Sequence, residues 1–284
     1  MHKDKPSRTA YKVALNIISL GAKPGMDKIL PPGIVETTKN LLLASGAAGQ
    51  KLVRWAASPR SVRLYEAFDW MMPGQFEAFA YRKAFCEQQV RDGISQSASQ
   101  ILVLGAGYDT MGLRLAPQFS GVNFFEIDHP TTASLKAKGI ETLGPRDNLY
   151  LIAEDLGKRK LVDVLKANKS WNPVSRTVII AEGLLMYLSP EAVHELFGQC
   201  AAIVGTGSRI AFSYIGTGAD GRPDVGRWTG LTMWTLKVSG EPWLWSIRPE
   251  EIGPFLEKTG WTNAPELVGE SDKHGVEFLG VAIK

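Results

Sequence analysis

The chain has 284 residues, of which 44% are hydrophobic and 21% charged, and its formal net charge at pH 7 is +3. These values fit one decorated globular domain, or one domain with a cap. No window approaches the ~18 consecutive apolar residues of a membrane helix, and the first eight residues are too polar for a signal peptide. Cys86 and Cys200 are too far apart for a metal motif. We therefore expect no metal site, no membrane partner and a cytoplasmic location.

The charge is unevenly distributed along the chain. The first 60 residues contain ten Lys or Arg against three Asp or Glu, a balance of +7 that leaves −4 for the remainder. A basic N-terminal segment could steer an anionic small molecule, although a solvated helical face explains it equally well. No basic run is interleaved with aromatic residues, so nucleic acid is not an expected partner.

Residues 1–95 are expected to form a helical N-terminal cap. Val13, Ile17 and Leu20 lie on one face at helical spacing, and no strand pattern occurs in this region. Prolines should divide the cap into short helices. They stand at positions 24, 31, 32, 59 and 73.

Residues 96–284 show a different pattern, in which short apolar runs alternate with helix-length segments. Alternation of this kind predicts an α/β domain with a doubly wound, Rossmann-like parallel sheet. The expected strands cover residues 101–104, 122–127, 149–153, 177–181 and 209–214.

The alternation is interrupted by a Trp-rich insertion at residues 215–247. Residues 216–227 are rich in glycine and predict a loop, and four tryptophans follow between Trp228 and Trp245. These rings could line a pocket for an aromatic ligand or could pack into the core. Strand patterns return at Thr262–Val268 and Val276–Ile283. The segment between them is too short for a parallel crossover, so we expect one antiparallel strand at the end of the sheet.

The first expected strand runs directly into Gly105-Ala106-Gly107-Tyr108-Asp109-Thr110. Glycines at this point let a ligand approach the backbone, and the following helix offers free N–H groups. A nicotinamide dinucleotide would favour a small third residue and would be repelled by Asp109 at its pyrophosphate. S-adenosylmethionine carries an ammonium and a sulfonium, so the motif favours this methyl donor. A plain glycine turn with a capping Asp is the alternative.

Acidic residues also follow the next three expected strands. Asp128 comes 21 positions after Gly107, near the spacing at which an acid reaches ribose hydroxyls, and Glu126 is the competing choice. Asp155 and Glu182 follow the third and fourth strands. Ligands of open α/β sheets bind beyond the carboxyl ends of the strands, so four polar clusters there predict a binding site.

These motifs resemble the leucine carboxyl methyltransferase-like family, which includes O-methyltransferases of polyketide biosynthesis. The resemblance covers roughly residues 76–283 and implies a class I methyltransferase fold. It rests on Gly105–Thr110 with Arg114-Leu115, Glu126–Pro130, Asp155-Leu156, Glu182-Gly183 with Tyr187-Leu188, Gly240–Pro242, Arg248–Glu251 and Gly260-Trp261.

The resemblance also implies roles for single residues. Gly105 and Asp128 would hold the backbone and ribose of the cofactor, Asp155 and Leu156 its adenine, and Glu182 its methionine part. Arg82 resembles an arginine at the carboxylate of the cofactor or the acceptor. The chain departs from the family at three positions on the acceptor side, namely Lys83, Glu87 and Met111.

We expect O-methylation of a small-molecule acceptor, preferably a carboxylate that becomes a methyl ester. A carboxylate of pKa ~4 needs no base at neutral pH, whereas a phenol of pKa ~10 does. His129 and His194 are the available histidine candidates for a base, and both are better explained as structural. Arg82 would then align the acceptor and Tyr187 would lie near it. The alternatives are methylation of a protein C-terminal carboxylate and, from another class, a nicotinamide-dependent oxidoreductase.

Overall fold

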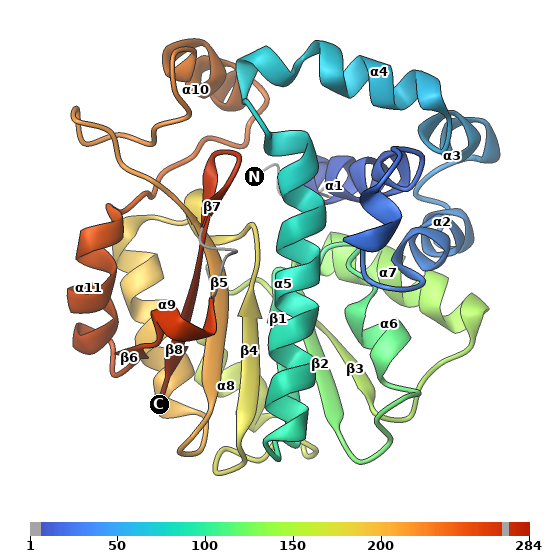
Figure 1. The fold of residues 1–284 in the computed structure, drawn as a ribbon. Helices are drawn as coiled ribbons and strands as arrows, with labels where there is room; N and C mark the ends of the chain where they lie inside the picture. The colour runs from blue at the N-terminus through green and yellow to red at the C-terminus, as the bar shows by residue number, and fades with distance from the viewer. Residues whose placement is uncertain (1–6, 269–272) are drawn as a thin grey trace.

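Parallel strands form most of the central sheet in the computed structural model, which describes residues 7–268 and 273–284. Every residue of β1, β4 and β5 is buried, which is why these strands read as continuous apolar runs rather than alternating ones. The order β3-β2-β1-β4-β5 confirms the predicted doubly wound sheet (Figure 1). The strands are β1 (Gln100–Leu104), β2 (Asn123–Asp128), β3 (Leu149–Ala153), β4 (Thr177–Ala181) and β5 (Arg209–Ile215).

One long antiparallel strand follows the parallel ones, as predicted. β8 (Glu277–Ile283) pairs with β5, and β6 (Thr262–Asn263) and β7 (Lys273–His274) both pair antiparallel with β8. The strand expected at Thr262–Val268 is wrong beyond its first two residues. Pro265 cannot donate a ladder hydrogen bond, and it starts the 3₁₀ helix η5 (Pro265–Leu267) instead. Residues 269–272 of the expected connection lie outside the described residues.

Helices cover both faces of the sheet. Leu102 and Leu104 of β1 pack in one core cluster with α8, α9 and α11, whereas Ile101 and Val103 pack in the other with α5 and α6. This division follows from the two-residue period of a strand. The helices that come after β1 are α6 (Met111–Leu115), α7 (Pro130–Leu143), α8 (Leu161–Lys166), α9 (Pro190–Ala202), α10 (Thr229–Val238) and α11 (Ile252–Lys258).

The N-terminal region is helical, as predicted, and its prolines lie at or between the helix ends. α5 packs against β4, β5, β7 and β8, so it belongs to the sheet layer although our predicted boundary at residue 95 groups it with the cap. The helices outside the sheet layer in this region are therefore α1 to α4 (Figure 1). The helices are α1 (Arg8–Leu20), α2 (Ile34–Ala44), α3 (Gln50–Ala56), α4 (Pro59–Ala67) and α5 (Gln75–Ser95).

Short 3₁₀ helices occupy several connections. In residues 215–247 a loop closed by a bridge between Thr217 and Pro223 leads into α10. Within the described residues, no helix combines the length and the apolar character needed to cross a bilayer. The 3₁₀ helices besides η5 are η1 (Met26–Lys28), η2 (Asp69–Met71), η3 (Leu185–Tyr187) and η4 (Pro249–Glu251).

Candidate active site

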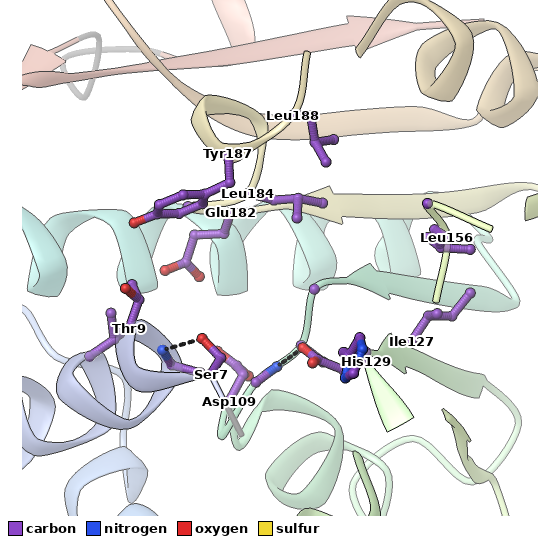
Figure 2. A pocket seen from close by; sticks show the side chains of 18 of the residues that line it. Ser7, Thr9, Asp109, Ile127, His129, Leu156, Glu182, Leu184, Tyr187 and Leu188 are labelled. Atoms are coloured by element: carbon purple, nitrogen blue, oxygen red, sulfur yellow. Dashed lines mark hydrogen bonds between the residues drawn. The ribbon is translucent and has the colours of Figure 1, made fainter. Parts of the chain in front are cut away.

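A cavity of about 670 Å³ lies beyond the carboxyl ends of β1 to β4. Its walls are the segments that follow these four strands, and its cover is formed by α1, part of α2 and residues 240–244 (Figure 2). The strand ends of an open α/β sheet are the usual place for a ligand, and the volume suits small molecules. The structure therefore brings the predicted clusters together in one cavity.

The glycine turn after β1 forms the floor next to α1. Gly107 has a φ of 49°, and a Cβ added there would lie only 2.9 Å from the Cβ of Ala10. Both the backbone conformation and the close approach of α1 therefore require glycine. The N–H of Gly107 donates a 2.6 Å hydrogen bond to Oδ2 of Asp128, which fixes the turn against the end of β2. Gly105 and Ala106 line the same wall.

The two acids of β2 lie in different surroundings. Asp128 lines the cavity. Glu126 is buried away from it, with its Oε2 2.6 Å from Nζ of the equally buried Lys136. Burial raises the pKa of Glu126, and Lys136 opposes that shift only in part. The ribose role therefore stays a prediction for Asp128, because Glu126 does not reach the cavity.

Arg82 and Lys83 hold a buried ionic cluster at the end of β4. Nε of Arg82 lies 2.7 Å from Oε1 of Glu182, and Nη1 of Arg82 contacts Glu277. Nζ of Lys83 contacts Asp109 and lies 2.9 Å from Oε2 of Glu182. All five side chains are buried, so two cations face three carboxylates where water does not screen them. The cluster thus carries one formal negative charge in excess.

The protonation states in this cluster follow from its contacts. Burial alone would raise the pKa of Asp109, but the ammonium groups of Lys83 and Lys136 and the N–H of Met111 outweigh burial and hold that pKa below its usual value. Burial alone would lower the pKa of Lys83, but Asp109 and Glu182 raise it above its usual range. Both groups are therefore charged at neutral pH.

Asp155 and Leu156 lie at the other end of the cavity, after β3. Oδ1 of Asp155 accepts a hydrogen bond from Gly157 N at 3.0 Å. Nε2 of His129 lies 4.0 Å from Oδ2 of Asp155, and Nδ1 of His129 lies 2.8 Å from the hydroxyl of Thr131. His129 is thus placed between the segments after β2 and β3, away from Tyr187 (Figure 2).

Tyr187 reaches the cavity from η3 and meets residues of α1 there (Figure 2). Burial raises the pKa of its phenol, and the neighbouring polar groups of Trp243 and Thr9 oppose this shift. Glu241 lies beside this group. Its Oε1 accepts a hydrogen bond from Thr9 N at 3.2 Å, and the Thr9 hydroxyl donates to its other oxygen. The Ser7 hydroxyl is 3.5 Å from the same carboxylate. Glu241 therefore ties the start of α1 across the cavity.

Sequence reasoning missed part of this site and misplaced another part. Ser7, Thr9 and Ala10 carry no local signal of their contacts, and Glu241 stood out only as part of the family resemblance. None of the tryptophans between Trp228 and Trp245 lines the cavity, and Trp245 packs into the core instead, which is the second of the two alternatives that the sequence left open for these rings. His194 does not line it either and packs edge-on against Phe255. No group of three or more potential ligands for a metal occurs among the described residues.

The charges of the cavity fit S-adenosylmethionine, whose ammonium and sulfonium outnumber its single carboxylate. The excess negative charge beside Glu182 would accept its methionine part, and Asp128 offers an acceptor for ribose hydroxyls. A pyrophosphate would instead meet the carboxylates of Asp109, Asp128 and Glu182. Sheet order, glycine turn and acidic strand ends together define a class I methyltransferase that uses S-adenosylmethionine.

Comparison with known proteins identifies the family. The model of the leucine carboxyl methyltransferase family matches residues 30–201, and the chain belongs to this family. It is 26% identical over 254 residues to a candidate S-adenosyl-L-methionine-dependent methyltransferase of Mycolicibacterium paratuberculosis, covering 81% of this chain and 79% of that one. A similarly named protein of Mycobacterium avium is 27% identical over 239 residues, which cover 77% and 72% of the two chains.

A solved structure shows the same fold. A candidate methyltransferase from Thermobifida fusca superimposes with a TM-score of 0.57 at 16% identity, covering 92% of this chain and 97% of that chain. The protein is therefore an S-adenosylmethionine-dependent methyltransferase, and the nicotinamide-dependent alternative is excluded.

Proposed function

We propose that the protein methylates an oxygen atom of a small acceptor, and that this oxygen belongs to a carboxylate, so that the product is a methyl ester. One observation carries the proposal. Among the described residues around Tyr187, we find no histidine, tyrosine or carboxylate side chain that is free to act as a base. A carboxylate is already ionised at neutral pH and needs none. Membership of a carboxyl methyltransferase family supports the same acceptor.

Each candidate base is already protonated, already hydrogen-bonded or distant from Tyr187. The raised pKa of Tyr187 keeps its phenol protonated, so this group can donate a hydrogen bond but cannot take up a proton. Glu241 accepts hydrogen bonds from the backbone and hydroxyl of Thr9 that hold the start of α1, so proton uptake by Glu241 would weaken that contact. His129 follows β2 and faces Asp155 after β3, and His194 lies outside the cavity. A phenol or alcohol would therefore lack the proton acceptor that its methylation requires.

The acceptor is aligned by neutral donors in this proposal. Arg82 and Lys83 line the cavity, but their charged ends are already bound by three carboxylates. A carboxylate clamp by Arg82, which the sequence predicts, would have to compete with Glu182 and Glu277. The O–H of Tyr187 is a neutral donor that lines the cavity on this side. Bound S-adenosylmethionine supplies an electrophilic methyl group, and positioning of the acceptor next to it is the main contribution of the protein.

The cover over the cavity favours a small acceptor over the C-terminus of a protein. α1 crosses the glycine turn in close contact at Ala10, and its first turn is tied to Glu241. Ser7 N also donates a 3.1 Å hydrogen bond to the hydroxyl of Thr132 in α7. A folded protein substrate would have to keep these contacts displaced while bound, whereas a small molecule displaces them only to enter and leave.

The test is transfer of labelled methyl from S-adenosylmethionine into a host small-molecule extract, followed by mild base. Release of the label as volatile methanol is the expected result, because esters are hydrolysed under these conditions. Label that survives base would identify an ether or amine and would overturn the carboxylate acceptor. Label recovered in host protein rather than in the small-molecule fraction would overturn the small acceptor.

A further inference from the structure

The outward surface of α3, α4 and α10 combines unpaired cations with exposed aromatic and aliphatic side chains. We call this surface, formed by residues 51–70 and 227–238, the outer edge. Figure 1 shows the three helices along one border of the molecule, with η2 joining α4 to the long helix α5. Neither the cavity nor the proposed reaction uses the outer edge.

The basic part of the outer edge is a shallow groove between α3 and α4. Its lining includes Lys51, Arg54, Arg60 and Arg63, together with the indole of Trp55 and no acidic residue. Within the part of the chain that the structure describes, none of these four cations forms an ion pair. The sequence from residue 45 to residue 65 also contains no Asp or Glu. The groove therefore has a positive potential that nothing nearby neutralises.

The apolar part of the outer edge lies at the other end of α4, on η2 and α10 (Figure 1). Trp70 and Trp228 contact each other edge to face, with centroids 5.0 Å apart, and this contact joins the two elements. Beyond it Trp234 is 62% exposed and Val238 is 68% exposed. Phe68 and Leu231 are exposed as well. Large apolar side chains gathered on one border of a monomer indicate a surface that is covered by something else.

These cations do not serve the cavity. The basic residues that line it are Arg82, Lys83 and residues 158–160, and none belongs to the outer edge. The sequence allows the basic N-terminal segment to steer an anionic substrate, but Lys51, Arg54 and Arg60 of that segment line the outer groove instead. These cations are therefore available to an anionic partner on the outside of the molecule.

We propose that the outer edge binds the surface of an anionic lipid bilayer. Arginine and lysine reach the headgroup phosphates, while tryptophan and aliphatic side chains enter the boundary between headgroups and acyl chains. The proposal agrees with α10, whose segment from residue 225 to residue 240 contains Arg227, Lys237 and two tryptophans but no acid. It revises our expectation of no membrane partner, because that expectation concerned spanning helices and not peripheral binding.

Two other partners fit the outer edge less well. A symmetric contact between two copies would place the same surface on both sides, so the interface would contain the unpaired cations of two grooves and no acidic groove residue to offset them. A nucleic acid would satisfy the cations but would leave aliphatic side chains such as Leu231 and Val238 without a partner on a phosphate backbone. An anionic bilayer offers phosphates to the cations of the outer edge and an apolar layer to its aromatic and aliphatic side chains.

The experiment is cosedimentation of the protein, saturated with S-adenosylhomocysteine, with phosphatidylcholine vesicles that contain or lack phosphatidylglycerol. We expect sedimentation only with phosphatidylglycerol, and loss of binding at about 1 M salt, where charges are screened within about 3 Å. Arg60→Ala with Arg63→Ala should weaken partitioning roughly 30-fold, from about a fivefold contribution per cation. Trp228→Ala with Trp234→Ala should also weaken it, and the quenching of tryptophan emission by brominated lipid should fall when these two rings are removed.

The matched control is Lys166→Ala with Lys169→Ala, which removes two exposed cations at the end of α8. This variant should partition like the wild type. All variants should keep the affinity for S-adenosylhomocysteine, because none of the changed residues lines the cavity. Failure to sediment with phosphatidylglycerol at low salt, or equal losses in the control, would overturn the proposal. So would a dimer in size-exclusion chromatography that the tryptophan changes disrupt, or binding of single-stranded RNA without binding of vesicles.

Discussion

The carboxylate of Asp128 lies at the end of β2 and has two possible hydrogen-bond partners, the N–H of Gly107 and a bound ribose. These partners determine the effect expected when the carboxylate is removed. It accepts the N–H of Gly107 at 2.6 Å and also lines the cavity, so a bound ribose would meet it directly. Asp128→Ala should lower the affinity for S-adenosylhomocysteine at least about tenfold, since a hydrogen bond to a charged group contributes about 1.5–3 kcal/mol. Isothermal titration calorimetry measures this change.

Glu126→Gln is the comparison for Asp128→Ala, because Glu126 is buried against Lys136 outside the cavity. It should leave the affinity within about twofold of the wild type and should lower the stability of the fold instead, because it leaves the buried Lys136 without its charge partner. If affinity falls with Glu126→Gln and survives Asp128→Ala, the ribose role belongs to Glu126.

We expect Arg82 to stabilise the fold, and to affect the site only because the fold holds the site together. Removal of its guanidinium leaves Glu182 and Glu277 as buried carboxylates with one cation fewer between them. Arg82→Ala should therefore lower the free energy of unfolding by about 3–5 kcal/mol in urea titrations. The partly exposed Arg91 is the control, because its partner Glu87 on α5 keeps a second ion pair with Arg114, and Arg91→Ala should cost about 1 kcal/mol or less.

A second comparison distinguishes a role of Arg82 in stability from a role in ligand binding. Adding Glu277→Gln to Arg82→Ala removes one of the unpaired charges, so the double variant should lose less stability than the two single variants together. If Arg82→Ala is instead as stable as the wild type and only its turnover fails, Arg82 acts on a bound ligand and the cluster does not depend on it.

Among the elements, α1 depends on contacts made far away in the sequence. Its first turn is held by Glu241 through the backbone and hydroxyl of Thr9, and its middle packs in a core cluster with α2 and α3. The first turn can therefore open without loss of the remaining helix. Since that turn covers the cavity, its opening is a natural step for ligand exchange.

Thr9→Val tests this arrangement because it removes the hydroxyl and keeps the shape of the side chain. Loss of one hydrogen bond, at about 1 kcal/mol, should speed hydrogen exchange of the first amides of α1 about fivefold. Thr142→Val, which removes a hydroxyl that bonds only within α7, should leave α1 unchanged. Unaltered exchange in Thr9→Val would mean that packing, and not Glu241, holds the first turn.

For the whole molecule, local sequence patterns predicted which strand ends form the site. They did not predict which charged side chains pair with one another there. The strands could be predicted because each buried strand is a continuous apolar run, and acids after such runs meet at one edge of the sheet. The pairing of Arg82 with Glu277 spans 195 positions, and that of Thr9 with Glu241 spans 232. No local pattern encodes such pairs, so the sequence suggested a free Arg82 where the fold provides a neutralised one.

The same cluster predicts how stability depends on pH. Asp109 has a lowered pKa in the folded protein, so its stabilising contribution is present above its unfolded value of ~3.9 and is lost as the pH falls below that value. Glu126 has a raised pKa, so its effect has the opposite sign. Its contribution is complete below ~4.3 and is lost as the pH rises through the folded value.

Urea titrations between about pH 3 and pH 7 separate the two groups. Asp109→Asn should flatten the acid side of the stability profile by up to about 1.4 kcal/mol per pH unit, the limit for one proton. Glu126→Gln combined with Lys136→Met replaces the buried pair by neutral groups, and it should gain stability relative to the wild type as the pH rises above ~4.3. Parallel profiles for wild type and Asp109→Asn would show that Asp109 titrates alike in the folded and unfolded chain. The ionic cluster would then contribute no acid sensitivity through Asp109, and the acid limit of the fold would have to come from other carboxylates.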